Sequence, residues 1–125
     1  MPRPEAVRRV KSYSAATGYV YQYYFYEVEK SRRGNSSGTE YTYMVSVDRK
    51  KVFPVKIFVA KEALENWSAR TGQQLTGTEE YAVAKMRLFQ AFDEGLVKAA
   101  TTGQQPGEVY VDEVNLEDLL GQLGI

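Results

Sequence analysis

The sequence predicts an α+β protein with an antiparallel sheet of three or four strands and two helices packed on one face of it. Three segments in the first half of the chain, 19–29, 40–48 and 52–59, are of strand length and rich in aromatic and β-branched residues. Two segments in the second half, 61–71 and 79–94, repeat apolar residues at helical spacing. We therefore expect a strand meander followed by two helices.

The first strand, 19–29, is apolar on both of its faces. Six of residues 19–26 are aromatic, and five of the chain's ten tyrosines lie there. The odd set is Tyr19, Tyr21, Tyr23 and Phe25, and the even set is Val20, Tyr24, Tyr26 and Val28. An antiparallel strand usually has one polar face, which identifies the other as the core face. Both faces of this strand are apolar, so periodicity alone does not choose between them. We favour the even set in the core, with Val28 opposite Tyr41, Tyr26 opposite Tyr43 and Tyr24 opposite Val45. That register leaves the odd set for function or assembly.

The next two strands alternate clearly. One face of 40–48 carries Tyr41, Tyr43, Val45 and Val47, and one face of 52–59 carries Phe53, Val55, Ile57 and Val59. Pairing Val47 with Phe53 aligns the two faces, places Val45 opposite Val55, and leaves a loop at 48–52. The glycine-bearing, polar stretch 31–38 is expected to be a long loop between the first two strands.

Helix ends can be predicted at both helical segments. Gly72 and Gly95 follow them and suit left-handed C-caps. Thr78 is expected to cap the second helix, with acidic residues complementing its first turn. This helix has only a narrow polar strip, so it is either the central helix of the fold or part of an interface.

The flanking segments divide the chain further. Residues 1–12 are expected to be a loose basic arm before a single domain at 13–97, and 98–108 a flexible linker. The tail, 109–125, predicts a short strand and a helical segment capped by Asn115. Its leucines require a surface on their own chain or on a partner, because so short a segment does not fold alone.

Composition excludes several chemistries. The 125 residues include no cysteine and no histidine, which removes thiolate chemistry and the commonest general base and metal ligand. Lys85 and Asp93 fall in the apolar arc of the second helix. We expect the stem of Lys85 to run along aromatic rings and its ammonium group to pair with an acidic residue at the rim. We predict no catalytic residue, no metal site and no cofactor. No stretch has the roughly 20 apolar residues of a membrane span, and a cytoplasmic location is expected.

Charge is distributed unevenly. Residues 1–56 hold 11 Lys and Arg against 5 Asp and Glu, a net charge of +6, and residues 57–125 hold the reverse, −6. A basic sheet that carries tyrosines is typical of single-strand nucleic-acid binding, in which bases stack on aromatic rings. The candidate binding residues are Tyr19, Tyr21, Tyr23, Phe25, Arg32, Arg33, Arg49, Lys50 and Lys51.

The function that we predict is a non-catalytic binding or self-association module, with a homodimer as the expected assembly. The alternative is single-stranded nucleic-acid binding through the tyrosine-rich face and the basic hairpin loops. A third hypothesis is a small enzyme that uses carboxylate, lysine or tyrosine chemistry.

Overall fold

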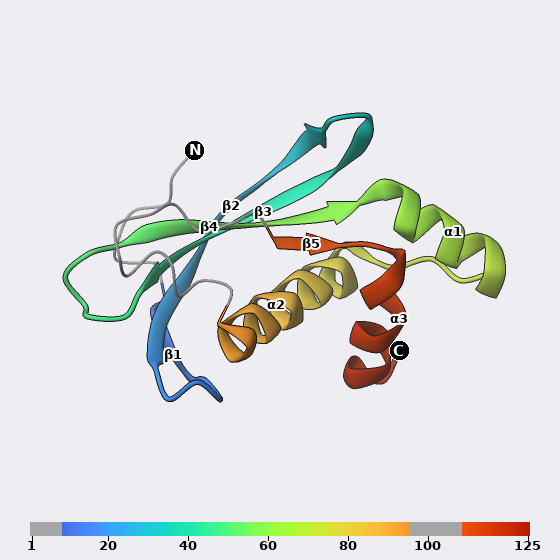
Figure 1. Ribbon diagram of the computed structural model, residues 1–125. Coiled ribbons are helices and arrows are strands. Elements are labelled where there is room, and N and C mark those ends of the chain that lie inside the picture. The colour runs from blue at the N-terminus through green and yellow to red at the C-terminus, as the bar shows by residue number, and fades with distance from the viewer. Residues whose placement is uncertain (1–8, 96–108) are drawn as a thin grey trace.

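The computed structural model describes residues 9–95 and 109–125. Their elements follow the order of a strand meander, two helices, a strand and a helix (Figure 1). The bounds are β1 Lys11–Ser14, β2 Val20–Arg33, β3 Ser36–Ser46, β4 Phe53–Ala60, α1 Lys61–Thr71, α2 Gly77–Glu94, β5 Val109–Val111 and α3 Glu113–Leu123.

The described elements form one curled sheet with helices against one face, which confirms the α+β class. The strand order is β1-β2-β3-β4-β5, so there are five strands and not three or four. The sheet is mixed, because β5 pairs with β4 in parallel while the other pairs are antiparallel. A parallel pair needs a crossover connection, and α1 and α2 lie in the crossover here. Figure 1 shows α2 and α3 below the sheet and α1 continuing from the end of β4.

The core lies between the sheet and α2 and α3. Tyr41, Tyr43, Val45, Val55, Ile57 and Val59 all face it and are buried, as expected. The predicted β3–β4 register is wrong by two residues, because Val45 pairs with Phe53 and Tyr43 with Val55. A shift of two preserves the faces. The connection is longer than expected, because Asp48 accepts hydrogen bonds from the backbone N–H groups of Lys50 and Lys51, at 2.8 and 2.9 Å.

The first strand buries its odd set, so the favoured register of β2 is wrong. Tyr23 pairs with Val45 and Phe25 with Tyr43, which turns the odd residues toward α2. The ladder shifts between Phe25 and Glu27, and beyond this bulge the expected Val28–Tyr41 pair does form. A bulge adds one residue to one strand and so exchanges the faces of everything that follows it.

Rings on α2 explain why the odd set is buried. Tyr21 stacks on Phe92, with centroids 4.2 Å apart and planes 6° apart. Tyr23 meets Phe89 edge-on at 5.6 Å. Offset stacks and edge-to-face contacts are the favoured geometries of aromatic pairs. The helix with only a narrow polar strip, α2, is therefore the central helix of the fold.

The stretch expected to be a long loop, 31–38, is mostly strand. β2 and β3 extend to Arg33 and Ser36, which pair directly and leave a two-residue turn. Gly34 has a φ of 59°, and glycine at the first central position suits a two-residue hairpin turn. The β2–β3 hairpin is consequently a long ribbon that projects beyond the rest of the sheet (Figure 1).

The helix predictions are confirmed with one shift. α1 occupies the predicted residues, and Gly72 and Gly95 have φ values of 71° and 75°. α2 begins at Gly77, because Thr76, and not Thr78, caps it in a capping box with Glu79.

The tail packs on its own chain. Leu116, Leu119 and Leu120 are buried, and Arg70 of α1 forms an ion pair with Glu117 at 2.9 Å. Asp112, and not Asn115, is the N-cap of α3, while Asn115 completes its capping box. Lys11 and Ser12 lie in β1, not in a loose arm. The rest of that arm up to residue 8 and the linker predicted at 98–108 lie outside the described residues.

Three tyrosines whose pKa is raised by the fold predict a loss of stability at alkaline pH. The hydrogen bond to Asp93 raises the pKa of Tyr13 to about 12, and burial raises the pKa of Tyr21 and Tyr43. A folded-state pKa above the ordinary value of 10.0 means that the folded protein holds these protons more tightly than the unfolded chain does. This stabilisation is complete below pH 10 and is lost as the pH rises through 12.

We therefore expect the free energy of unfolding, measured in urea, to decline above about pH 10. Tyrosinate absorbance from the buried rings should rise together with unfolding. Ionisation of all ten tyrosines near pH 10 in a protein that stays folded would contradict this prediction.

Candidate functional site

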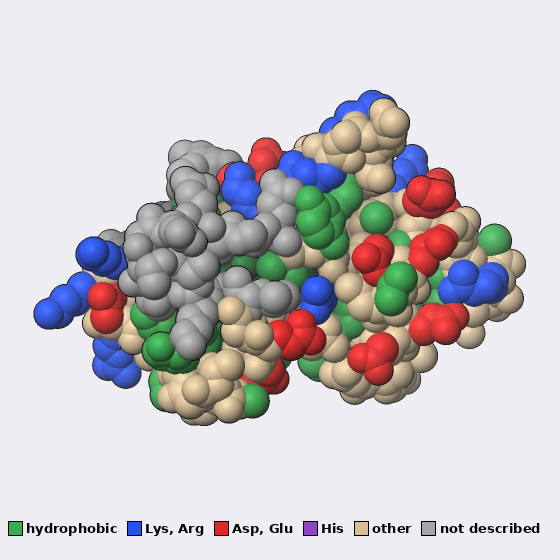
Figure 2. Space-filling model, viewed as in Figure 1, with side chains coloured by type: hydrophobic (Ala, Val, Ile, Leu, Met, Phe, Trp, Pro, Cys, Tyr) green, Lys and Arg blue, Asp and Glu red, His purple; other side chains and the backbone are tan. Residues whose placement is uncertain are grey.

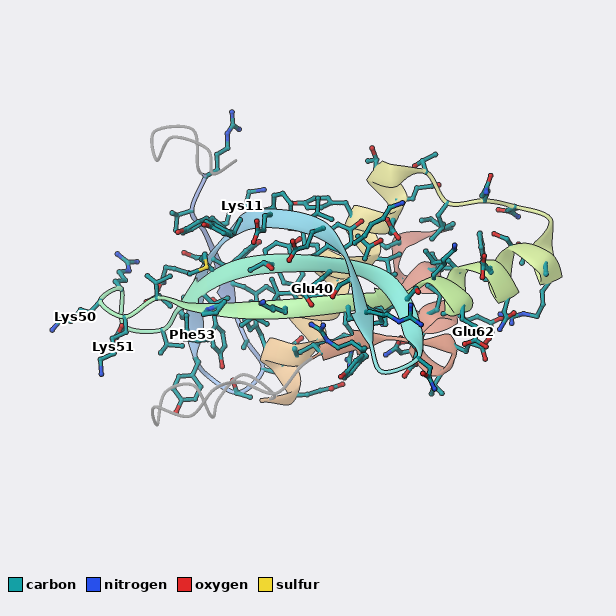
Figure 3. All side chains as sticks on the ribbon, turned by 90° about the horizontal axis from the view of Figure 1, so that it is seen from above. Lys11, Glu40, Lys50, Lys51, Phe53 and Glu62 are labelled. Atoms are coloured by element: carbon teal, nitrogen blue, oxygen red, sulfur yellow. The ribbon has the colours of Figure 1, made fainter. Side chains whose placement is uncertain are left out.

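The sheet has an outer face, opposite α2 and α3, and this face carries the candidate site. Figure 3 looks down on it, with the helices behind the strands. A hollow of about 450 Å³ lies at the end of this face nearest β1 and the β3–β4 loop. We call it the outer-face hollow; its lining residues are Val10, Ser12, Gln22, Tyr23, Tyr24, Met44, Val45, Ser46, Arg49 and Val52. Its volume falls within the range of small-ligand sites, roughly 300–1,000 Å³.

β1 forms one wall of the hollow, and α2 holds this strand in place. Ser12 pairs with Gln22 across the β1–β2 ladder. Asp93 of α2 accepts hydrogen bonds from the Tyr13 hydroxyl at 2.7 Å and from the Ala16 N–H at 2.9 Å. A charged carboxylate accepts stronger hydrogen bonds than a neutral acceptor does. These two bonds therefore hold β1, a strand of only four residues, against α2.

The β3–β4 loop forms the opposite wall. Ser46 accepts a hydrogen bond from the Arg49 N–H at 2.8 Å, and Asp48 accepts two more from the backbone. These bonds lower the pKa of the Asp48 carboxyl, because backbone N–H donors favour its charged form. Arg49 has a φ of 63°, a conformation that a residue other than glycine adopts only when its surroundings hold it. These hydrogen bonds hold the backbone of the loop in which Arg49 lines the hollow.

The lining combines apolar walls with a few polar groups. Val10 and Val52 are 62% and 51% exposed, and Met44 and Tyr24 are half-buried. The Gln22 Oε1 atom is buried and meets no hydrogen-bond donor among the described residues. A buried acceptor without a partner costs about 1–3 kcal/mol, and a ligand donor would recover that cost. The hollow can accept an apolar or aromatic body that carries a donor and an anionic group.

The structure separates the sequence-predicted binding residues. Tyr21 and Tyr23 are 0% and 5% exposed, so their rings face α2 and not a partner. Phe25 is half-buried against Tyr81, with ring centroids 5.4 Å apart, and Tyr19 lies at the surface. The register is the reason, because burying the odd set leaves the even set on the outer face.

The basic candidates fall at opposite ends of the molecule. Arg49, Lys50 and Lys51 belong to the β3–β4 loop, whereas Arg32 lies near the tip of the hairpin. Arg33 forms an ion pair with the buried carboxylate of Glu40, to which the Lys56 ammonium also lies 3.4 Å away. Figure 3 shows Glu40 on the outer face, far from Lys50 and Lys51. Only Arg49 lines the outer-face hollow.

Sequence reasoning missed two polar residues that line the hollow, Gln22 and Ser46. Gln22 is the one polar residue within the aromatic stretch 19–26, and Ser46 is polar on the alternating strand. Polar residues at those positions indicate an outward face, so Gln22 was a signal against the even set as core. Val10 and Val52 carried no such signal.

Asp93 and Lys85, the two charged residues in the apolar arc of α2, lie against β1 and against aromatic rings respectively. Asp93 accepts the two hydrogen bonds, from Tyr13 and Ala16, that hold β1 against α2. The Lys85 ammonium lies 6.0 Å from the ring centroids of Tyr23 and Phe89, and burial lowers the pKa of Lys85. Lys85 therefore lies against aromatic rings, as expected, but the expected ion pair with an acidic residue is not found among the described residues. Within 9–95 and 109–125, no group of three or more acidic side chains could hold a metal ion.

Comparisons with known proteins identify no relative: no family model, curated protein or solved structure matches the chain. No helix in the described part of the chain is long and apolar enough to cross a membrane.

Proposed function

We propose that this protein is a non-catalytic binding module whose ligand occupies the outer-face hollow. The observation that carries the proposal is the Gln22 Oε1 atom, which is buried and meets no donor among the described residues, in a residue that lines the hollow together with Arg49 and apolar walls. A small site with few convergent polar groups and mostly apolar walls is the usual form of a ligand pocket. The matching ligand has an aromatic or apolar body, one hydrogen-bond donor and one anionic group.

Three probes that differ by one group each test this ligand chemistry. The first, 4-hydroxyphenylacetate, has the ring, the donor and the carboxylate; phenylacetate lacks the donor, and 4-methylphenol lacks the carboxylate. We expect 4-hydroxyphenylacetate to shift the backbone amide signals of Gln22, Met44 and Ser46 in ¹⁵N–¹H NMR spectra. Each of the other probes should bind about fivefold to tenfold more weakly, because a hydrogen bond or ion pair contributes roughly 1 kcal/mol net.

Two variants of the same loop provide the control. Arg49→Gln should remove the preference for 4-hydroxyphenylacetate over 4-methylphenol, because the guanidinium is the group that meets the carboxylate. Lys50→Gln changes the net charge equally, but Lys50 does not line the hollow. An equal loss in both variants, or shifts that avoid the hollow, would contradict the proposal.

Self-association through the same face is the second candidate. It is favoured by Val10, Val20 and Val52, which are 62%, 46% and 51% exposed. Val20 belongs to the even set of β2 and so faces outward with Gln22. Sedimentation velocity on the NMR samples tests it: a dimer that 4-hydroxyphenylacetate dissociates supports this candidate, and a monomer at every concentration contradicts it.

A further inference from the structure

A second hollow lies beside the β2–β3 hairpin, at the end of the sheet where β4 leads into α1. It has a volume of about 690 Å³. We call it the cationic hollow; it is lined by Lys30, Ser31, Arg32, Ser37, Gly38, Thr39, Lys61, Leu64 and Glu80. It shares no lining residue with the outer-face hollow, so what it binds is independent of the function proposed above.

The hairpin aligns two cationic side chains with two hydroxyls. Lys30 pairs with Thr39 and Arg32 with Ser37 across the ladder. Residues two apart in a strand share a face and lie about 7 Å apart. All four side chains are on the face that Val28 and Tyr41 share, on the helix side of the sheet. Lys61, the first residue of α1, adds a third cation from another element.

The charges of this hollow are unbalanced. Among the described residues, Lys30, Arg32 and Lys61 make no ion pair, in contrast to Arg33, Lys56, Arg70 and Arg87. Within the part of the chain that the structure describes, the Arg32 guanidinium has one long hydrogen bond, 3.5 Å, to the Gly34 carbonyl. Glu80 is the one acidic residue in the lining, and its carboxylate accepts a hydrogen bond from the Tyr41 hydroxyl at 2.7 Å.

The wider charge distribution agrees with an anionic ligand at the hairpin. Figure 2 shows acidic side chains gathered over α1 and α3, and basic ones over the hairpin and the end of the β3–β4 loop. Three cations against one carboxylate leave two positive charges in the lining, which a monovalent anion does not neutralise.

We infer that the cationic hollow binds a ligand with two or more adjacent phosphate groups. The Arg32 guanidinium offers paired N–H donors that match phosphate oxygens, and the two ammonium groups add point charges. The Ser37 and Thr39 hydroxyls donate further hydrogen bonds. Successive phosphates occur in a free oligophosphate and in the backbone of a single-stranded nucleic acid, and both present several anionic phosphate oxygens to these side chains.

Inorganic tripolyphosphate tests the site by NMR at constant ionic strength. We expect it to shift the amide signals of Ser37, Thr39 and Lys61, and to bind more tightly than sulfate. The double variant Arg32→Gln/Lys61→Gln should weaken binding about tenfold or more, because hydrogen bonds to charged groups contribute more than neutral ones. The control Lys50→Gln/Lys51→Gln changes the net charge equally at the other end of the molecule and should bind within about twofold of the natural chain.

A fluorescein-labelled ten-nucleotide thymidine strand distinguishes the two sources. If the ligand is a nucleic-acid backbone, the strand binds more tightly than tripolyphosphate and loses affinity as salt rises and in the Arg32→Gln/Lys61→Gln variant. If the ligand is a free oligophosphate, tripolyphosphate binds and the strand does not compete. Either result supports a phosphate site. Failure of both probes to bind, or equal loss in the two double variants, would overturn the inference.

Discussion

We expect Tyr21→Ala to lower the free energy of unfolding by about 3–5 kcal/mol, the range for truncating a large aromatic side chain in a core. Tyr21 is 0% exposed and stacks on Phe92, so its removal leaves a cavity between β2 and α2. Natural domains are stable by only about 5–15 kcal/mol, so this single change removes a large part of the total. Urea unfolding followed by circular dichroism measures it.

Tyr24→Ala is the matched comparison, because Tyr24 belongs to the same strand but faces outward. It is half-buried on the outer face, and we expect a loss of roughly 1 kcal/mol. Tyr21→Phe keeps the ring and its stack, so it should stay within about 1 kcal/mol of the natural chain even if Tyr21→Ala does not fold. If Tyr24→Ala proves the more damaging variant, the even set faces the core and the register described above is wrong.

The second large effect concerns the tail. Leu119 is 0% exposed and belongs to the same core cluster as residues of α2 and the sheet. Leu119→Ala should cost about 2–5 kcal/mol in unfolding experiments. Val114→Ala is the control, because Val114 lies in the same helix and is 91% exposed; it should change stability by less than about 0.5 kcal/mol.

The same unfolding curves test whether the tail packs on its own chain. If α3 packs in cis, the urea midpoint should not change over a roughly hundredfold range of protein concentration, for the natural chain or for Leu119→Ala. A midpoint that rises with concentration would mean that α3 completes the core of a second copy.

The candidate sites were only partly predictable from the sequence. Arg49 and Arg32 were recognised as binding candidates from their charge, and each lines a hollow. Their separation was not predictable, because it depends on β2 and β3 extending into a long hairpin. Gln22 and Ser46 were missed as site residues, because a polar residue on a strand indicates an outward face but does not show that a hollow lies on that face.

The sequence by itself determined the α+β class, the two helices and their glycine C-caps, and the core face of β3 and β4. These features follow from local chemistry: apolar period, turn residues and the left-handed preference of glycine at Gly72 and Gly95. The tertiary structure decided the rest, namely the core face of β2, the two-residue shift of β4 and the place of the tail. In β2 both faces are apolar, so the choice came from rings on α2, and one extra residue at the bulge then exchanged the two faces.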